Sequence, residues 1–378
     1  MSRPRRVLFF TVAFEEGGGE RLYVNLLRAL DRERFEPSLL CWKVHDSHFV
    51  RELPADVPVV DLARGDTRFR RELPRLLRQT ASAIRRLRPD TIMSISTEMN
   101  LVLYAARKLA GSSARIVLNE QGSPSAWLDL IRAKQPLRAR AVEQGYARLP
   151  RGGLVVCVAE TVRRDLIERF GCDPARLVTI PNPVDLDRVR QLAAEPAELP
   201  WEAGSTTIVS VGRFFPQKGY DVLARGFARI AAESDARLVL VGDGPERDHV
   251  ETILREAGVA DRAALVGYRE NPFPYVASGS VFVLPSRSEG FGYVVAEALA
   301  LGVPIVSTAC AGPADILDGG RYGELVPVDD DEALAAATLE LLRDPERRRT
   351  LAEAGPLRAE EFGLDSVVAA YERVLGAD

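Results

Sequence analysis

Short apolar runs alternate with longer amphipathic stretches along most of the chain. The clearest unit lies at 281–306, where an apolar run is followed by a polar, glycine-containing loop and then by apolar residues at the spacing of one helix face. Gly302 and Pro304 end that helix and introduce another apolar run. The unit predicts a strand, a loop, a helix and a second strand. Its loop follows a parallel strand, at the position where open α/β sheets bind ligands.

The same alternation recurs on both sides of a break near residue 181. Strands are expected at 6–12, 37–42, 57–62, 91–95, 115–119, 154–158, 177–180, 206–211, 238–241, 264–266, 281–284 and 323–328. Helices are expected at 69–87, 100–110, 137–146 and 364–375, and a loop around Gly122, Pro124 and Trp127. Alternating strands and helices are typical of parallel sheets with crossover helices, so the predicted fold class is α/β.

Two prolines indicate a domain boundary. Pro181 and Pro183 stop regular structure, a mixed polar stretch follows, and the alternation restarts near residue 206. A chain of 378 residues is long enough for two domains with complete cores. We expect one domain at 1–181, a second at 182–360 and a terminal helix within 361–378.

The composition of the chain bears on its predicted cellular location and on whether it holds disulfides or a metal ion. Apolar residues make up 46% and charged residues 28% of the chain, as in ordinary soluble globular proteins. No apolar run approaches the roughly 20 residues of a membrane span, and no signal-peptide core follows the start, which favours a cytoplasmic location. The four cysteines include no CxxC pair and the three histidines lack further ligands nearby, so neither a disulfide framework nor a metal site is expected.

The net charge of −4 is unevenly distributed. Residues 1–180 contain 31 Lys and Arg against 21 Asp and Glu, whereas the other 198 residues contain 19 against 33. The helix at 69–87 would combine an apolar stripe with arginines on its other faces. That pattern fits a helix lying on a membrane or, more commonly, a core-packed helix with a solvated basic face. The basic half favours an acidic acceptor or an anionic membrane over an acidic-domain partner. Nucleic acid is not expected as a partner, because the overall charge is acidic and no stacking-aromatic motif is present.

The loop of the strand–loop–helix unit contains candidate ligand-binding groups. Glu289 lies in the loop, and Glu297 follows eight positions later inside the helix. Gly290 and Gly292 would let backbone amides approach a ligand, and the helix start favours phosphate. Glu297 could accept hydrogen bonds from a ribose, with Glu289 facing a sugar beyond the phosphates. The alternative is a helix capping box from Ser286 to Glu289, which would place both glycines unfavourably in the first helical turns.

A second glycine-bounded loop contains two cations. Arg213 and Lys218 follow the strand at 206–211, and only four of the 50 basic residues in the chain are lysine. Gly212 and Gly219 bound this loop. A guanidinium and an ammonium at a strand end suit a diphosphate, and ordinary surface charges are the alternative.

Strand ends in the first half also gather small or polar residues. Residues 17–19 are three glycines between a strand and a helix, at a spacing that matches neither a dinucleotide fingerprint nor a P-loop. Ser96 and Asn100 follow one strand and Glu120 follows the next, so we expect them on the rim of a second binding surface. Helix caps and a plain flexible loop are the alternatives.

Four segments, in order, resemble those of the retaining family-4 glycosyltransferases of the GT-B fold. They are GGGERLYVNL at 17–26, IPNPVD at 180–185, VGRFFPQKG at 211–219 and SRSEGFGYVVAEALALGVPIVST at 286–308, the last similar to the E-x7-E signature of the family. The resemblance runs over nearly the whole chain. It implies two Rossmann-like domains with parallel sheets facing each other across a cleft, and a final helix that packs back on the amino-terminal domain.

The resemblance also implies roles for the candidate residues. A nucleotide diphosphate sugar, most simply a UDP-sugar, would donate a hexose or N-acetylhexosamine with retention of configuration. Arg213 and Lys218 would bind the departing diphosphate as catalytic cations. Glu289, as the third catalytic residue, would hold the transferred sugar. Further donor contacts are implied for Gly18, Gly19, Gly212, Tyr268, Arg269, Gly290, Phe291, Gly292 and Glu297, and acceptor contacts are expected for Ser96, Asn100 and Glu120.

Departures from the family pattern leave the acceptor open. Residues 119–124 read NEQGSP where many members have a histidine, and Gln121 and Ala159 stand where arginine and serine are usual. The acceptor is expected to be a hydroxyl on a small molecule, a lipid-linked precursor or a glycan. The basic first domain could contact the inner face of a membrane peripherally. A GT-B-fold nucleotide-sugar epimerase and a non-catalytic nucleotide-sugar-binding protein are the alternatives, and neither a metal nor a cofactor is expected.

Overall fold

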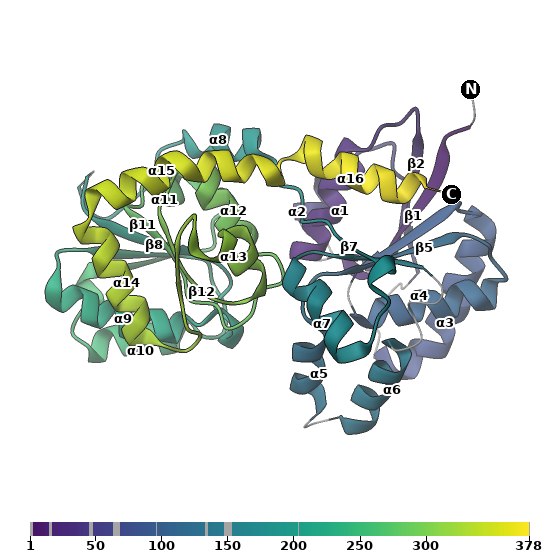
Figure 1. Cartoon of the computed structure of the whole chain (residues 1–378), viewed down its shortest axis with the longest axis horizontal. Coiled ribbons are helices and arrows are strands. Elements are labelled where there is room, and N and C mark those ends of the chain that lie inside the picture. Colours follow the sequence, from purple (N-terminus) through teal and green to yellow (C-terminus); the bar gives the residue numbers. More distant parts are fainter. Residues whose placement is uncertain are drawn as a thin grey trace. The chain divides into compact units, whose positions relative to one another are not determined.

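The protein consists of two compact units (Figure 1). The computed structural model describes residues 3–14, 17–44, 48–62, 69–95, 97–132, 135–146, 153–202 and 204–377. The first unit contains Met1–Pro183 and Leu364–Asp378, and the second contains Val184–Gly363. The chain passes from the first unit to the second after Pro183. The Pro183 carbonyl accepts a hydrogen bond from Asn25 Nδ2 at 2.7 Å, which holds this residue on the first unit.

The first unit is built on a seven-stranded parallel sheet with the order β3-β2-β1-β4-β5-β6-β7. Its strands are β1 (Arg5–Phe14), β2 (Phe35–Val44), β3 (Val59–Asp61), β4 (Thr91–Ile95), β5 (Arg115–Glu120), β6 (Leu154–Cys157) and β7 (Leu177–Thr179). The strand order reverses between β1 and β4. The carboxyl ends of these two strands therefore form the switch point at which such sheets bind ligands.

Helices from both ends of the chain complete the first unit. They are α1 (Gly18–Ala29), α2 (His48–Arg51), α3 (Phe69–Leu87), α4 (Thr97–Ala110), α5 (Pro124–Arg132), α6 (Pro136–Tyr146), α7 (Glu160–Phe170) and α16 (Leu364–Gly376), with a 3₁₀ turn η2 at Pro174–Arg176. The last helix, α16, lies beside α1 (Figure 1) and buries Tyr371 and Leu375 in the core that α1 and the sheet share. Asn119 Nδ2 donates to the Tyr371 hydroxyl at 2.8 Å, and Thr91 Oγ1 donates to the Leu375 carbonyl at 3.0 Å. The helix is therefore joined to the sheet by polar as well as apolar contacts.

The second unit repeats this architecture with a six-stranded parallel sheet in the order β10-β9-β8-β11-β12-β13. Its strands are β8 (Thr207–Val211), β9 (Arg237–Val241), β10 (Ala263–Gly267), β11 (Val281–Leu284), β12 (Ile305–Thr308) and β13 (Glu324–Val326). Its helices are α8 (Leu186–Ala193), α9 (Tyr220–Glu233), α10 (Arg247–Glu256), α11 (Phe273–Ala277), α12 (Tyr293–Ala300), α13 (Ala311–Ile316), α14 (Asp331–Arg343) and α15 (Pro345–Ala359). The switch point of this sheet lies between β8 and β11.

The α/β prediction with two parallel sheets is confirmed, and so is the interpretation of the basic helix. In α3, Leu76, Ala81 and Ile84 are buried in the first unit, whereas Arg78 and Arg86 are exposed. The helix therefore packs on the core through its apolar stripe and presents Arg78 and Arg86 to solvent.

Two helices occupy segments that the sequence predicted to be irregular. Helix α8 lies in the stretch after the domain boundary, where Asp185 accepts a hydrogen bond from the Arg188 amide at 3.1 Å and so caps the helix start. Helix α5 replaces the loop expected around residues 122–127. It begins at Pro124, a residue that is compatible with the first helical turn. Asp165 of α7 holds this start by accepting from the Ser123 hydroxyl at 2.8 Å.

Candidate active site

Two loops of the second unit meet at the carboxyl edge of its sheet. Residues 212–219 follow β8 and residues 285–292 follow β11, and these two strands are neighbours. The loops are in backbone contact, because a Cβ atom added to Gly219 would lie 2.1 Å from the Pro285 carbonyl oxygen. Gly219 also has a left-handed backbone, with φ of 66°, so glycine is required on both counts.

The facing loops bring Lys218 and Glu289 into contact. Lys218 Nζ lies 2.5 Å from Glu289 Oε1, and the Ser286 hydroxyl donates to the same oxygen at 2.7 Å. The two charged side chains are 25% and 10% exposed, so the pair is shielded while remaining accessible. Helix α12 begins only at Tyr293, so the capping-box alternative for Ser286 and Glu289 is wrong.

Arg213 lies on the same loop as Lys218 but differs in its surroundings. Its side chain is exposed, and the guanidinium carbon lies 5.3 Å from the centroid of the Phe215 ring. The structure therefore places two of the three predicted catalytic residues, Lys218 and Glu289, in contact, and leaves Arg213 exposed five positions before Lys218.

The predicted donor-binding residues around α12 form a rigid turn. Gly292 is the residue immediately before helix α12, and its backbone is left-handed, with φ of 90°. Gly312 of α13 packs against this turn so closely that a Cβ atom there would lie 2.2 Å from the Phe291 carbonyl oxygen and 2.4 Å from that of Gly290. Glu297 lies on α12 and is half-buried. This packing fixes the direction of the amides at the start of α12.

The remaining candidates of the second unit lie along the same edge of the sheet. A Cβ atom on Gly242, after β9, would lie 2.0 Å from the Gly212 carbonyl oxygen, so the loops after β8 and β9 also touch. Tyr268 and Arg269 follow the outer strand β10 and are exposed. Arg269 Nε donates to the Tyr275 hydroxyl at 3.1 Å, and this hydrogen bond raises the pKa of the guanidinium.

Two of the predicted acceptor residues belong to a buried network in the first unit. Glu120 and Asn100 are fully buried, and Asn100 Nδ2 donates to one carboxylate oxygen of Glu120. Thr97 Oγ1 donates to the other at 2.9 Å, and the Ser94 hydroxyl donates to Asn100 Oδ1 at 2.5 Å. Ser96 lies outside the described residues. The described members of the set thus contact protein groups and shape the ends of β4 and β5.

The predicted glycines of the first unit lie at its switch point. Helix α1 begins at Gly18, and a Cβ atom on Gly19 would lie 2.9 Å from Ile95 Cδ1 at the end of β4. Nearby, Asn182 Nδ2 donates to Gln121 Oε1 at 2.7 Å, and Gln121 Nε2 donates to Asn182 Oδ1 at 3.1 Å. This reciprocal pair joins the end of β5 to the segment that leaves the unit.

Both halves of the sequence match known families. Residues 205–344 match the model described as Glycosyl transferases group 1, and residues 16–188 match the model described as Glycosyltransferase Family 4. The chain belongs to glycosyltransferase family 4. This glycosyltransferase is 25% identical over 363 residues to the N-acetylgalactosamine-N,N'-diacetylbacillosaminyl-diphospho-undecaprenol 4-alpha-N-acetylgalactosaminyltransferase of Campylobacter jejuni, across 93% of this chain and 94% of that one.

Solved structures confirm the GT-B fold of this glycosyltransferase. Sucrose-phosphate synthase from Thermosynechococcus elongatus superposes with a TM-score of 0.81 at 20% identity, over 98% of each chain. Anabaena HepE in complex with UDP superposes with a TM-score of 0.78 at 18% identity, over 98% of this chain and 99% of that one.

Within residues 3–377, gaps excepted, no helix is both long and apolar enough to cross a membrane. The same residues contain no group of three or more His, Cys, Asp or Glu placed to hold a metal ion. All four cysteines are free and buried, and burial raises the pKa of the Cys310 thiol to about 11, so that thiol is protonated at neutral pH.

Arg287 fastens the two site loops of the glycosyltransferase together, a role that the sequence analysis missed. Its guanidinium donates to both carboxylate oxygens of Asp221 at 2.9 and 2.8 Å, and also to the Pro216 carbonyl. Its own amide donates to the Gln217 carbonyl at 2.8 Å. Burial raises the pKa of Asp221, but the hydrogen bond and charge of Arg287 outweigh it and hold that pKa below its usual value. The only sequence signal was an arginine inside the loop that carries Glu289.

Replacing Arg287 by glutamine should lower sugar transfer about tenfold and raise the donor KM, because the loop carrying Lys218 loses its anchor while Lys218 itself remains. Losing hydrogen bonds between charged groups also destabilises the unit by about 1–3 kcal/mol. Steady-state kinetics and thermal unfolding measure the two effects. Arg287→Lys should restore part of kcat.

The matched control is Arg225→Gln, since Arg225 donates to the same carboxylate of Asp221 at 3.3 Å and its other acceptor is Asp331 of α14, at 3.4 Å. Equal kinetic losses in Arg225→Gln and Arg287→Gln would show that Asp221, and not the loop contact, accounts for the effect.

Proposed function

We propose that this glycosyltransferase transfers a hexose or N-acetylhexosamine from a nucleotide diphosphate sugar, in the first instance a UDP-sugar, to a hydroxyl acceptor with retention of configuration. The strongest support is the Lys218–Glu289 pair: Glu289 lies in the loop that leads to the start of α12, and Lys218 lies in the neighbouring loop before α9. A cation for phosphate, a carboxylate for sugar hydroxyls and helix-start amides are thereby gathered at one sheet edge. Glu297 on the same helix suits a ribose diol.

The reaction breaks the bond between the anomeric carbon and the β-phosphate oxygen, which keeps the electron pair while the sugar gains oxocarbenium character. Lys218, Arg213 and the amides at the start of α12 would stabilise this developing negative charge. The acceptor oxygen forms the new bond on the face that the diphosphate leaves, and its proton passes to a diphosphate oxygen. Glu289 accepts from Lys218 and Ser286 through Oε1, which leaves Oε2 to orient a sugar hydroxyl.

The relatives guide the proposal for the two substrates. The Campylobacter jejuni relative is named for transfer to a diphospho-undecaprenol-linked sugar, and HepE was solved in complex with UDP. We therefore favour a lipid-linked or polymeric glycan as acceptor, ahead of a small soluble molecule. Such an enzyme would act in the cytoplasm and touch the inner face of the membrane peripherally through its basic first domain.

A panel of nucleotide sugars, scored by thermal shift and by donor hydrolysis, tests the donor assignment. One UDP-sugar should raise the unfolding free energy by about 2.7 kcal/mol at a concentration of 100 times its Kd. NMR of the transferred product should then show the anomeric configuration of the donor. An inverted product, or no stabilisation by any nucleotide sugar, would contradict the proposal. A rearranged free nucleotide sugar would favour the epimerase, and binding without turnover would favour a non-catalytic protein.

A further inference from the structure

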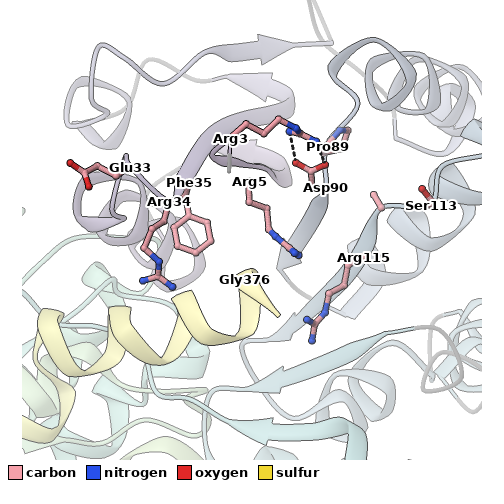
Figure 2. A pocket seen from close by; sticks show the side chains of 11 residues that line it. Arg3, Arg5, Glu33, Arg34, Phe35, Pro89, Asp90, Ser113, Arg115 and Gly376 are labelled. Atoms are coloured by element: carbon pink, nitrogen blue, oxygen red, sulfur yellow. Dashed lines mark hydrogen bonds and ion pairs between the residues drawn. The ribbon is translucent and has the colours of Figure 1, made fainter. Parts of the chain in front are cut away.

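A pocket lined by four arginines lies at the amino edge of the sheet in the first unit (Figure 2). Its volume is about 820 Å³, which is within the range of small-molecule sites. Arg5, Phe35 and Arg115 are the first residues of β1, β2 and β5, and Gly376 of α16 lines another side. All strands of this sheet are parallel, so the pocket lies at the edge opposite to the carboxyl ends. It is therefore distinct from the switch point of the unit.

Guanidinium groups outnumber carboxylates in the pocket lining. The charged lining residues are Arg3, Arg5, Arg34 and Arg115 against Glu33 and Asp90. Asp90 is already committed, since it accepts from Arg3 at 2.8 and 2.9 Å and from the Arg6 amide at 2.9 Å (Figure 2). Burial raises the pKa of Asp90, but these hydrogen bonds lower it below its usual value overall. Asp90 thus stays ionised and pairs with Arg3, and four guanidinium groups line the pocket in all.

Helix α16 and the residue that follows it hold two of these arginines in place. Arg5 Nη1 donates to the Ala377 carbonyl at 2.8 Å, and Arg34 forms an ion pair with Glu372. The Arg34 guanidinium carbon also lies 5.1 Å from the centroid of the Phe35 ring. In Figure 2, Arg5 and Arg115 extend from different strands toward the end of α16. Cationic groups held in advance in this way lose little freedom when an anion binds.

We propose that this pocket binds an anion that carries two or more phosphate groups. Guanidinium groups bind phosphate oxygens through paired hydrogen bonds, and several of them from separate strands suit more than one phosphate. Phe35, the aromatic residue of the lining, is 2% exposed and offers little surface for stacking a base. The arginine guanidinium groups would therefore recognise the anion by its charge, without stacking on a base. A soluble oligophosphate and a lipid diphosphate head group both present this chemistry.

Isothermal titration with inorganic pyrophosphate at low salt tests the proposal. The background is Arg213→Ala with Lys218→Ala, which removes the proposed donor site from the measurement. This protein should still bind one pyrophosphate, and adding Arg5→Gln with Arg115→Gln should weaken that binding at least tenfold. The matched control adds Arg78→Gln with Arg86→Gln, which removes the same charge from the exposed face of α3 and should change the affinity less than twofold.

A second variant distinguishes loss of binding from misfolding of the arginine variants. Gly376→Glu keeps every arginine and places a carboxylate beside them, and a Cβ atom there meets only the Phe35 ring, at 3.4 Å, and Arg34 Nη2, at 3.9 Å. It should weaken pyrophosphate binding while leaving the unfolding temperature within a few degrees. Unchanged affinity in both pocket variants, or equal loss in the α3 control, would overturn the proposal.

Vesicle sedimentation identifies the source of the anion. Full-length protein is mixed with phosphatidylcholine vesicles that contain a polyprenyl diphosphate or lack it. If the pocket serves a lipid, the diphosphate vesicles alone should retain the protein, and retention should be lost in Gly376→Glu and on adding pyrophosphate. Pyrophosphate binding without such retention would identify a soluble oligophosphate as the ligand and would equally support the pocket. Neither result depends on the donor assignment, because sugar transfer is not measured.

Discussion

Replacing Lys218 by alanine should lower the rate of sugar transfer by about 10²–10³-fold, the loss typical of removing one group that stabilises a developing negative charge. In the proposed reaction the Lys218 ammonium faces the departing diphosphate. In the structure it lies 2.5 Å from Glu289, so it also positions the carboxylate that would hold the sugar. Both functions are lost together, which is why the effect should exceed that of Arg287→Gln.

Initial rates at saturating donor, followed by thermal unfolding, measure this prediction. The unfolding temperature should change little, because Ser286 still donates to the Glu289 carboxylate at 2.7 Å. Lys108→Ala is a suitable control, since Lys108 is an exposed lysine on α4 of the other unit. Lys218→Arg should recover part of the rate by restoring the charge. Transfer by Lys218→Ala within a few-fold of the parent enzyme would rule out the proposed role.

Replacing Gly219 by alanine should destabilise the second unit by about 3 kcal/mol or more and reduce transfer at the same time. A left-handed backbone alone costs a residue with a side chain about 1–2 kcal/mol. The new Cβ atom would also lie 2.1 Å from the Pro285 carbonyl oxygen, so the two site loops must separate. Because Lys218 and Glu289 lie on those two loops, their contact should be weakened as well.

Denaturant-induced unfolding and steady-state kinetics measure both effects. Gly258→Ala is the matched control, because Gly258 has φ of 71° but no atom within 4 Å of an added Cβ. The control should lose only the 1–2 kcal/mol of the left-handed backbone and keep full activity. Equal losses of stability in the two variants would show that the loops can move apart at no cost, contrary to the packing described here.

The strand–loop–helix unit around Glu289 could be predicted from the sequence because its signals are local. An uninterrupted apolar run gave β11, and residues at helical spacing gave α12. The contact between Lys218 and Glu289 could not be predicted in this way. The two residues are 71 positions apart, and they meet because β8 and β11 are neighbours in the sheet, an order that tertiary packing decides.

Other residues show where local signals are insufficient. Asp185 is a recognisable helix cap, but two prolines just before it favoured an irregular segment, so α8 was missed. Glu120 ends a strand, and the strand-end rule predicted a rim position. It is fully buried instead, because β5 lies between β4 and β6 and Asn100 closes over its carboxylate. Arg287 has partners on three separate segments, which no single-sequence pattern reveals.

The return of α16 to the first unit determines when that unit can finish folding. During synthesis, residues 1–183 leave the ribosome long before Tyr371 and Leu375, whose side chains belong to the core of that same unit. The intervening unit is continuous in sequence and can close as soon as it has emerged. The apolar surface that α16 covers must therefore stay exposed on the nascent chain, a natural target for a chaperone, until α16 itself has been made.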